Sequence, residues 1–308
     1  MLIAIDHGNK QIKLPSGKAF STGLCERDTR PPFGEDILQY KGKYYTISED
    51  RIPYTREKFK DERFYILTLF AIAFEIEGKG CYEPGLMSIQ LLVGLPPAHF
   101  GAQYECFEKF FKRGGIEEFE FHGKKFRIHI NEVTAFPQAF SAAMPIYSHI
   151  NTYPKVMIID IGGFTADYLQ LKNGQTDLSV CDSLEHGVIA LYTQVKSRVN
   201  SSFDILLDES DIDFILNGGV HDFGENGVNA MRVVHDASQT FVSDLLGKLR
   251  ERGIDLRSGK TVFVGGGSIL LRKQIEMSGK VASPIFVDKI SANAKGYEML
   301  YNASKTKG

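Results

Sequence analysis

The sequence has few of the features that several large classes of protein require. Its four cysteines are scattered without a CxxC pair, which argues against a zinc site and favours free thiols in a reducing compartment. Lys and Arg total 36 against 38 for Asp and Glu, with no long basic block, which argues against a direct, non-specific nucleic-acid binder. The longest apolar stretch, residues 64–74, is shorter than the ~18 residues of a membrane span and is typical of a buried helix.

The sequence also lacks the glycine spacings of two common nucleotide-binding folds. Neither GxGxxG nor GxxxxGK[ST] occurs, which argues against a Rossmann dehydrogenase and against a P-loop protein. Residues 1–10 carry neither the basic segment nor the long apolar segment of a targeting signal. We therefore expect a cytoplasmic protein with no membrane partner.

Length and composition favour a globular chain of two domains. The chain has 308 residues, of which 43% are apolar and 24% are charged. A cluster of turn-forming residues at 151–154 separates two α/β patterns, so we predict domains 1–151 and 152–308. We also predict one long buried helix over residues 58–77 and a last helix, near residues 292–301, that packs back on the first domain.

The most informative feature is a pattern that occurs once in each half. The first strand ends in Asp6 and is followed by Gly8 and a return strand. Asp160 and Gly162 repeat this order 154 positions later, again between an apolar strand and a return strand. The repeat indicates two similar α/β halves.

A strand that ends in Asp and turns through Gly is suited to binding phosphate. Glycine has no side chain to block the approach of an oxyanion to backbone N–H groups. The Asp carboxylate would repel phosphate directly, so its useful role is to hold a hydrated Mg²⁺ that bridges to the phosphates. One such turn by itself is better explained as a plain hairpin with an exposed acid, whereas two in duplicated halves can bind one polyphosphate from opposite sides.

Three further features carry possible chemistry. Lys13, on the return strand, can reach a phosphate as a point charge, with Lys10 as its local competitor and a solvated surface lysine as the alternative. A buried strand breaks into three glycines and Ser268 at residues 261–268, which lets a flat ligand approach the backbone. Gln138 can orient a water for attack on a γ-phosphate, although by itself it is better explained as a loop glutamine.

Together these motifs resemble those of the actin-like ATPase superfamily. The phosphate motifs match residues 6–13 and 160–167, the adenosine motif matches 264–268, and the two connecting segments match 133–143 and 292–296. The resemblance implies an α/β, actin-like (ribonuclease H-like) duplicated fold with two domains and a nucleotide cleft between them. It extends over essentially the whole chain.

The resemblance also implies a role for each matching residue. Asp6 and Asp160 would hold the hydrated Mg²⁺, and Gln138 would place the attacking water, so these three form the predicted catalytic set. The predicted phosphate contacts are Gly8, Asn9, Lys10, Lys13, Gly162, Gly163 and Thr165. The predicted adenosine contacts are Gly265, Gly266, Gly267 and Ser268, with Lys196 as a loose match near the base or ribose.

The sequence is most similar to the ParM-type plasmid-segregation actins and their archaeal relatives. The short chain and the patterns at residues 58–77, 93–96 and 293–297 carry this likeness. Two positions depart from the family pattern. Asn9 stands where many members have Ser or Thr, and Gln138 stands where some ParM-type proteins have Glu. A glutamine leaves catalysis to positioning, which is typical of a slow hydrolase.

The resemblance implies a polymerising ATPase that uses ATP and Mg²⁺, with GTP as a possible substitute. Its partners would be further copies of itself and a DNA-binding adaptor that links the filament to a plasmid, so that nucleic acid is contacted indirectly. One alternative is a small-molecule kinase or phosphatase on the same scaffold, although no acid stands at the Gln138 position. Another is a non-polymerising, nucleotide-dependent interaction module. The role of the acidic, glycine-rich residues 208–227 is left open.

Overall fold

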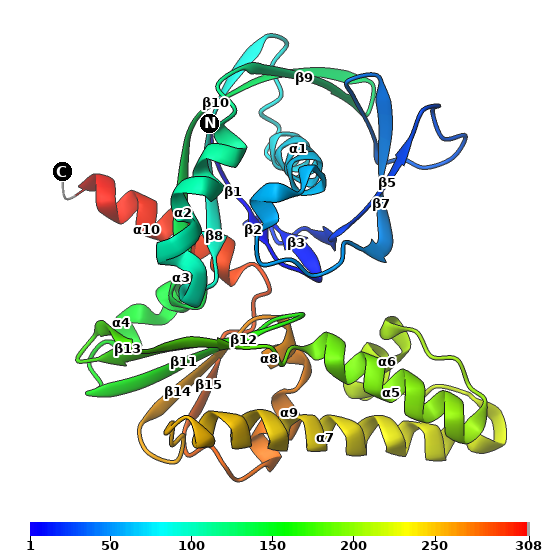
Figure 1. The fold of residues 1–308 in the computed structure, drawn as a ribbon, viewed down its shortest axis with the longest axis vertical. Helices are drawn as coiled ribbons and strands as arrows, with labels where there is room; N and C mark the ends of the chain where they lie inside the picture. The colour runs from blue at the N-terminus through cyan, green and yellow to red at the C-terminus, as the bar shows by residue number, and fades with distance from the viewer. Residues whose placement is uncertain (307–308) are drawn as a thin grey trace. The chain divides into compact units, whose positions relative to one another are not determined.

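A computed structural model describes residues 1–306 of the chain. The chain divides into two compact units, which are described separately (Figure 1). Unit 1 contains residues 1–145 together with the C-terminal segment from residue 290, and unit 2 contains residues 146–289. The predicted boundary between residues 151 and 152 lies a few residues past this division.

Unit 1 is built from two sheets and several helices. Its strands are β1 (Leu2–Ala4), β2 (Asp6–His7), β3 (Gln11–Lys13), β4 (Ala19–Ser21), β5 (Gly23–Arg27), β6 (Ile37–Tyr40), β7 (Lys43–Arg51), β8 (Leu86–Leu95), β9 (Ile116–Phe121) and β10 (Lys124–Pro137). Its helices are the 3₁₀ helix η1 (Lys58–Lys60), α1 (Glu62–Gly78), α2 (Pro97–Lys112), α3 (Phe140–Ala143) and α10 (Ala292–Thr306). The 3₁₀ helix η2 (Met144–Ile146) lies at the division between the units.

The core of unit 1 surrounds helix α1. The larger sheet has the order β1-β8-β10-β9-β6-β7-β5, and β2-β3-β4 form the smaller one. Figure 1 shows the strands of this unit curving around α1. Because α1 is apolar on nearly every side, its residues 64–76 are all buried, as expected of a helix enclosed by other elements.

The predicted helix over residues 58–77 is interrupted near its start. Asp61 has an extended backbone (φ −118°, ψ 108°) that separates η1 from α1. Its carboxylate accepts a hydrogen bond from the Arg63 amide, which satisfies a backbone donor that has no partner within the helix. The Asp61 cap thus begins the long helix later than the hydrophobic pattern predicts.

Unit 2 has one mixed sheet of five strands with the order β13-β12-β11-β14-β15. These strands are β11 (Lys155–Ile161), β12 (Ala166–Lys172), β13 (Gln175–Leu184), β14 (Lys260–Val264) and β15 (Pro284–Phe286). The helices are α4 (Tyr147–Ile150), α5 (Val188–Phe203), α6 (Glu209–Leu216), η3 (Gly224–Asn226), α7 (Gly227–Glu251), α8 (Gly266–Leu270) and α9 (Arg272–Met277). One hydrophobic cluster joins β11, β12, α5, α6 and α7, so the sheet and these helices share a core.

The acidic, glycine-rich residues 208–227 contain helix α6. A reciprocal capping box begins it: the Asp208 side chain accepts from the Asp211 amide, and the Asp211 side chain accepts from the Asp208 amide. Ile212, Ile215 and Leu216 bury the inner face of the helix. Among residues 1–306, no helix has both the length and the apolar character needed to cross a bilayer.

Helix α10 packs on unit 1 through close backbone contacts. The Asn293 side chain accepts a hydrogen bond from the Ala139 amide at 3.1 Å, at the start of α3. Tyr297 is fully buried, and its ring lies against Gly94 of β8. Gly296 lies so close to Ser141 that a Cβ at this position would overlap the Ser141 backbone carbonyl. Small residues therefore set how closely α10 approaches the rest of the unit.

We expect Gly296→Ala to destabilise unit 1 by about 1–3 kcal/mol, because the new methyl group overlaps backbone that cannot move aside easily. This loss exceeds the gain of about 1 kcal/mol that alanine brings to a helix interior. Urea unfolding followed by circular dichroism measures the difference. The matched control is Gly101→Ala in α2, where an added Cβ meets open space and only the stabilising helix term applies. Equal stabilities of the two variants would contradict the packing argument.

Candidate functional site

The first predicted turn is a hairpin between β2 and β3. Asp6 and Lys13 are direct partners in the antiparallel pair, with 3.8 Å between Asp6 Oδ2 and Lys13 Nζ. Asp6 is 2% exposed, so the lysine faces a carboxylate that is almost shielded from water. A Cβ at Gly8 would lie 2.6 Å from the Gln11 carbonyl oxygen, so the turn admits only glycine at this position. Asn9 and Lys10 complete the hairpin and are partly exposed.

Gln138 lies directly against Asp6. Its Nε2 donates a hydrogen bond of 2.8 Å to Asp6 Oδ1, across 132 positions of sequence. The backbone N–H of Gln138 donates to the backbone carbonyl of Leu95 at 2.8 Å, which fixes the end of β10 beside the end of β8. The next residue, Ala139, has φ +60° and ends the strand abruptly before α3. The structure thus brings together two of the three predicted catalytic residues.

Three residues that the sequence analysis did not select support the turn from the protein interior. The Lys58 ammonium donates to the backbone carbonyl of His7. The His7 ring is fully buried, stacks on Phe111 at 4.8 Å, and its Nε2 lies 2.8 Å from the Thr68 hydroxyl. Their only sequence signal is the position of His7 between Asp6 and Gly8, because Lys58 and Thr68 belong to a distant segment.

The environment of His7 keeps its ring neutral. The Thr68 hydroxyl donates to the Phe64 carbonyl at 2.7 Å, so it accepts from His7 and the proton lies on Nε2. Burial, and secondly the charge of Lys58, lower the pKa of His7 from 6.5 to about 3. Because His7 is neutral, the positive charge behind the turn, on the side of the protein interior, comes from Lys58.

The second predicted turn lies between β11 and β12 of unit 2 and has the same register as the first. Asp160 is paired with Asp167, as Asp6 is paired with Lys13. The Gly162 amide donates to the Thr165 carbonyl at 2.8 Å and closes the turn. The repeat that the sequence predicts is therefore confirmed in the strand pairing, with an acid in place of the lysine.

Asp167 is held by hydrogen bonds from β13 and from the turn itself. Its carboxylate accepts hydrogen bonds from the Ser183 hydroxyl and, at 3.3 Å, from the Thr165 hydroxyl. Thr165 and Asp167 are both buried, so they stabilise the return strand from within unit 2. Gly162 and Gly163 lie at the tip, where the amides of Val188 and Ile189 donate to their carbonyls at 3.1 and 2.9 Å. The turn is thus bonded to the start of α5.

The glycine triplet lies against this second turn. Gly265 follows β14 with φ +85°, and a Cβ there would overlap the Asp160 carboxylate. A Cβ at Gly267 would lie 2.6 Å from the Ile161 side chain. Gly266 begins α8, and Ser268 is completely buried within it. The structure thus brings the predicted adenosine segment next to Asp160, and the ligand contacts of its four residues stay a prediction.

Lys196 lies apart from the turn. It is on α5, eight residues after Val188, which places it about 12 Å along the helix from the turn. Hydrogen bonds from the Ser210 hydroxyl and then the Asp211 amide lower the pKa of Asp208, and the charge of Lys196 is the smallest of the causes. A contact between Lys196 and a nucleotide therefore stays a prediction.

Comparisons with known proteins match each half of the chain to a family of actin-like proteins. Residues 4–140 match the family model of the actin-like proteins' N-terminal domain, and residues 158–277 match that of the archaeal actin homologue MreB-like C-terminal domain. No curated protein matches the sequence.

Three solved structures share the fold over nearly all of both chains. A 15-stranded ParM filament from Clostridium botulinum has 18% sequence identity and a TM-score of 0.75, covering 98% of this chain and 99% of that one. The archaeal actin homolog Ta0583 in complex with ADP has 16% identity and a TM-score of 0.76, with the same coverage. An Alp12 filament has 17% identity and a TM-score of 0.67, covering 99% and 98%. The predicted actin-like fold is therefore confirmed.

We expect acid to destabilise the protein through His7. The unfolded histidine binds a proton below pH 6.5, whereas the folded one binds it only near pH 3, so stability falls as the pH falls between these values. For this one group the loss is about 1.4 kcal/mol per pH unit, or about 2 kcal/mol between pH 6.5 and pH 5. His7→Gln removes this contribution, which urea unfolding at pH 7 and pH 5 measures as a smaller loss on acidification.

The control for this prediction is His149→Gln, which removes an exposed histidine on α4. It should retain the pH dependence of the wild-type protein. If His7→Gln loses as much stability between pH 7 and pH 5 as the wild-type protein, the conclusion that His7 is buried and neutral is wrong.

Proposed function

This chain belongs to the actin-like proteins, and we propose that it is a nucleotide-dependent ATPase that assembles into filaments. One observation carries the proposal. In each unit a strand ends in an Asp, turns through Gly and pairs that Asp with the residue seven positions later, and in unit 1 the Gln138 side chain also donates a hydrogen bond to the Asp. A single hairpin of this kind does not by itself indicate a phosphate-binding site. Two of them in one chain supply the backbone donors and the carboxylates that a triphosphate with its cation needs.

We propose that the two turns bind the phosphates of one nucleotide. Gly8 and Gly162 leave backbone free of side chains at the turns, and Lys13 supplies a positive charge beside Asp6. Of the three glycines after β14, Gly265 and Gly267 pack closely against residues 160–161, whereas Gly266 faces open space, so we propose that a flat base or ribose approaches the backbone at Gly266. The ADP complex of the archaeal homolog Ta0583 supports a nucleotide as the ligand.

The acidic residues fit a hydrated Mg²⁺. This cation keeps several of its waters and uses one or two carboxylates together with substrate phosphates. Asp6 offers one nearly buried carboxylate whose charge Lys13 and Gln138 only partly compensate, and Asp160 is the equivalent residue in unit 2. When bound, Mg²⁺ would neutralise charge on the phosphates. Asp6 and Asp160 would hold it.

Gln138 is the residue that we propose to orient the attacking water. Its Nε2 donates to Asp6, which leaves Oε1 as an acceptor for a water proton. An amide does not take up the proton, so it contributes by positioning rather than as a base. Slow hydrolysis follows from this chemistry and suits an enzyme whose nucleotide state controls assembly.

We propose that the triphosphate state favours self-assembly and that hydrolysis weakens it. A ligand shifts assembly only if it binds the assembling conformation more tightly, and the γ-phosphate contacts supply that difference. The filament structures of ParM and Alp12 support self-assembly for a chain with this fold. Plasmid DNA, reached through a DNA-binding adaptor, is the cargo that we propose.

We expect Asp6→Asn to weaken binding of Mg²⁺-ATP by at least about tenfold, because it removes a carboxylate that the cation requires. Gln138→Ala should retain nucleotide binding and lose about 100-fold in hydrolysis, because the water is no longer held for attack. A fluorescent ATP analogue measures binding, and phosphate release measures hydrolysis.

The same two variants test assembly. Wild-type protein should pellet with ATP and Mg²⁺ at tens of micromolar, Gln138→Ala should form longer-lived polymer, and Asp6→Asn should remain unassembled. Glu276→Gln, on the surface of α9, is the matched control and should behave as wild type. A wild-type protein that binds ATP and stays monomeric would refute filament formation, whereas unchanged ATP binding by Asp6→Asn would refute the site.

A further inference from the structure

A buried threonine that the sequence analysis did not select holds the backbone of the first turn from the protein interior. Thr22 lies between β4 and β5 and is 1% exposed. Its hydroxyl donates a hydrogen bond of 2.7 Å to the Gly8 carbonyl, across 14 positions of sequence. Its backbone N–H donates to the Lys10 carbonyl at 3.1 Å. One residue thus holds two carbonyls of the turn.

Thr22 is itself fixed by the strands around it. Its carbonyl accepts a hydrogen bond of 2.9 Å from the N–H of Ile52, a buried residue that follows β7. The next residue, Gly23, is packed so tightly that a Cβ there would overlap the carbonyls of Ser48 and Asp50 on β7. The Thr22 hydroxyl therefore acts on the turn from a rigid part of unit 1.

A third carbonyl of the turn is also held by a buried donor. The Lys58 ammonium donates to the His7 carbonyl, and Lys58 is buried like Thr22. The carbonyls of His7 and Gly8 therefore both point toward donors inside unit 1. Two consecutive peptide groups of the turn have their orientation set by side chains from other segments of the chain.

The orientation of a carbonyl also fixes the N–H group of the same peptide. In a planar trans peptide the two groups point in opposite directions, and no cis peptide occurs within residues 1–306. The Gly8 N–H is turned back to the Asp6 carbonyl, at 3.0 Å. The Asn9 N–H belongs to the peptide whose carbonyl Thr22 holds, so it points away from Thr22, toward the partly exposed side of the turn.

A positive charge lies at the same turn. The Lys13 Nζ is 3.8 Å from the position that a Cβ at Gly8 would occupy. A backbone N–H and an ammonium group, next to a glycine that carries no side chain, are groups suited to binding an oxyanion. The direction of the Asn9 N–H therefore matters for a phosphate at this turn.

We propose that Thr22 is a positioning residue of the phosphate site, whose hydroxyl holds the Gly8 carbonyl inward and so aims the Asn9 N–H at a phosphate of the nucleotide. This inference rests on the proposed function and adds a residue that contacts no ligand itself. Gly8 makes the restraint necessary, because glycine allows the Gly8–Asn9 peptide to rotate. A rotated peptide would present its carbonyl oxygen to the phosphate in place of the N–H.

Thr22→Val tests the hydroxyl, because valine keeps nearly the shape of threonine and has no donor. We expect it to weaken ATP binding by about tenfold, as for the loss of one hydrogen bond to a charged group. Binding of adenosine, which has no phosphate, should stay within about twofold of the wild type. Thr22→Ser keeps the donor and should bind ATP as the wild type does. Calorimetric titration measures the affinities for both ligands.

A second measurement follows the Asn9 N–H itself. In protein with isotope-labelled asparagine, ATP should shift the Asn9 amide resonance of the wild type and of Thr22→Ser, and should leave that of Thr22→Val nearly unchanged. The matched control is Thr240→Val, which removes a hydrogen bond of 2.9 Å from a threonine hydroxyl to the Asp236 carbonyl within α7. It should behave as the wild type in both measurements.

The outcomes separate this inference from the proposed function. If the wild type binds ATP and Thr22→Val binds it equally well, or still shows the Asn9 shift, the role of Thr22 is wrong and the nucleotide site stands. If Thr22→Val weakens ATP and adenosine equally, Thr22 acts only on folding, and its positioning role is again wrong. A wild type that binds no ATP would refute the nucleotide site, and the role of Thr22 with it.

Discussion

The structure of the candidate site depends on one constraint: two residues that face each other across an antiparallel hairpin cannot move independently. In unit 1 this pairing fixes Asp6 opposite Lys13, and in unit 2 it fixes Asp160 opposite Asp167. Glycine at the turn keeps backbone donors accessible, and a side chain there would collide with the return strand. The ladder thus sets the distance between the functional groups before any ligand is present.

Buried polar groups behind the first turn make its geometry costly to change. His7, Thr68 and the Phe64 carbonyl form a chain of hydrogen bonds in the interior, and the Lys58 ammonium is bonded to the carbonyl of His7. Loss of any one partner leaves another buried polar atom without a hydrogen bond, which costs about 1–3 kcal/mol. Gln138 restrains Asp6 from the other side. These contacts favour a preorganised carboxylate, which electrostatic catalysis requires.

Unit 2 holds the second turn in close packing. Its glycines press the turn, the start of α5 and the triplet around Asp160 into close packing. A Cβ at Gly187, Gly265 or Gly267 would overlap atoms of residues 160–164, so these three positions admit only glycine.

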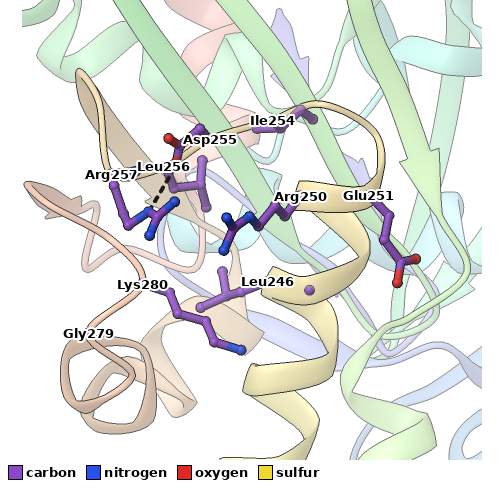
Figure 2. Close-up of a pocket in the computed structure, with 10 residues that line it drawn as sticks. Leu246, Arg250, Glu251, Ile254, Asp255, Leu256, Arg257, Gly279 and Lys280 are labelled. Atoms are coloured by element: carbon purple, nitrogen blue, oxygen red, sulfur yellow. Dashed lines mark hydrogen bonds and ion pairs between the residues drawn. The ribbon is translucent and has the colours of Figure 1, made fainter.

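The sequence alone predicts the duplicated turns, the two α/β halves and the glycine triplet, because each is a local pattern whose spacing is fixed by strand and turn geometry. It does not pair Gln138 with Asp6, because that contact depends on β10 lying beside β8, and β8 beside β1. Lys58 and Thr68 likewise reach His7 only through tertiary packing. The pocket shown in Figure 2 joins lining residues between 246 and 257 to residues 279–280, which the packing of unit 2 brings together. Local patterns determine elements, whereas long-range packing decides which side chains meet.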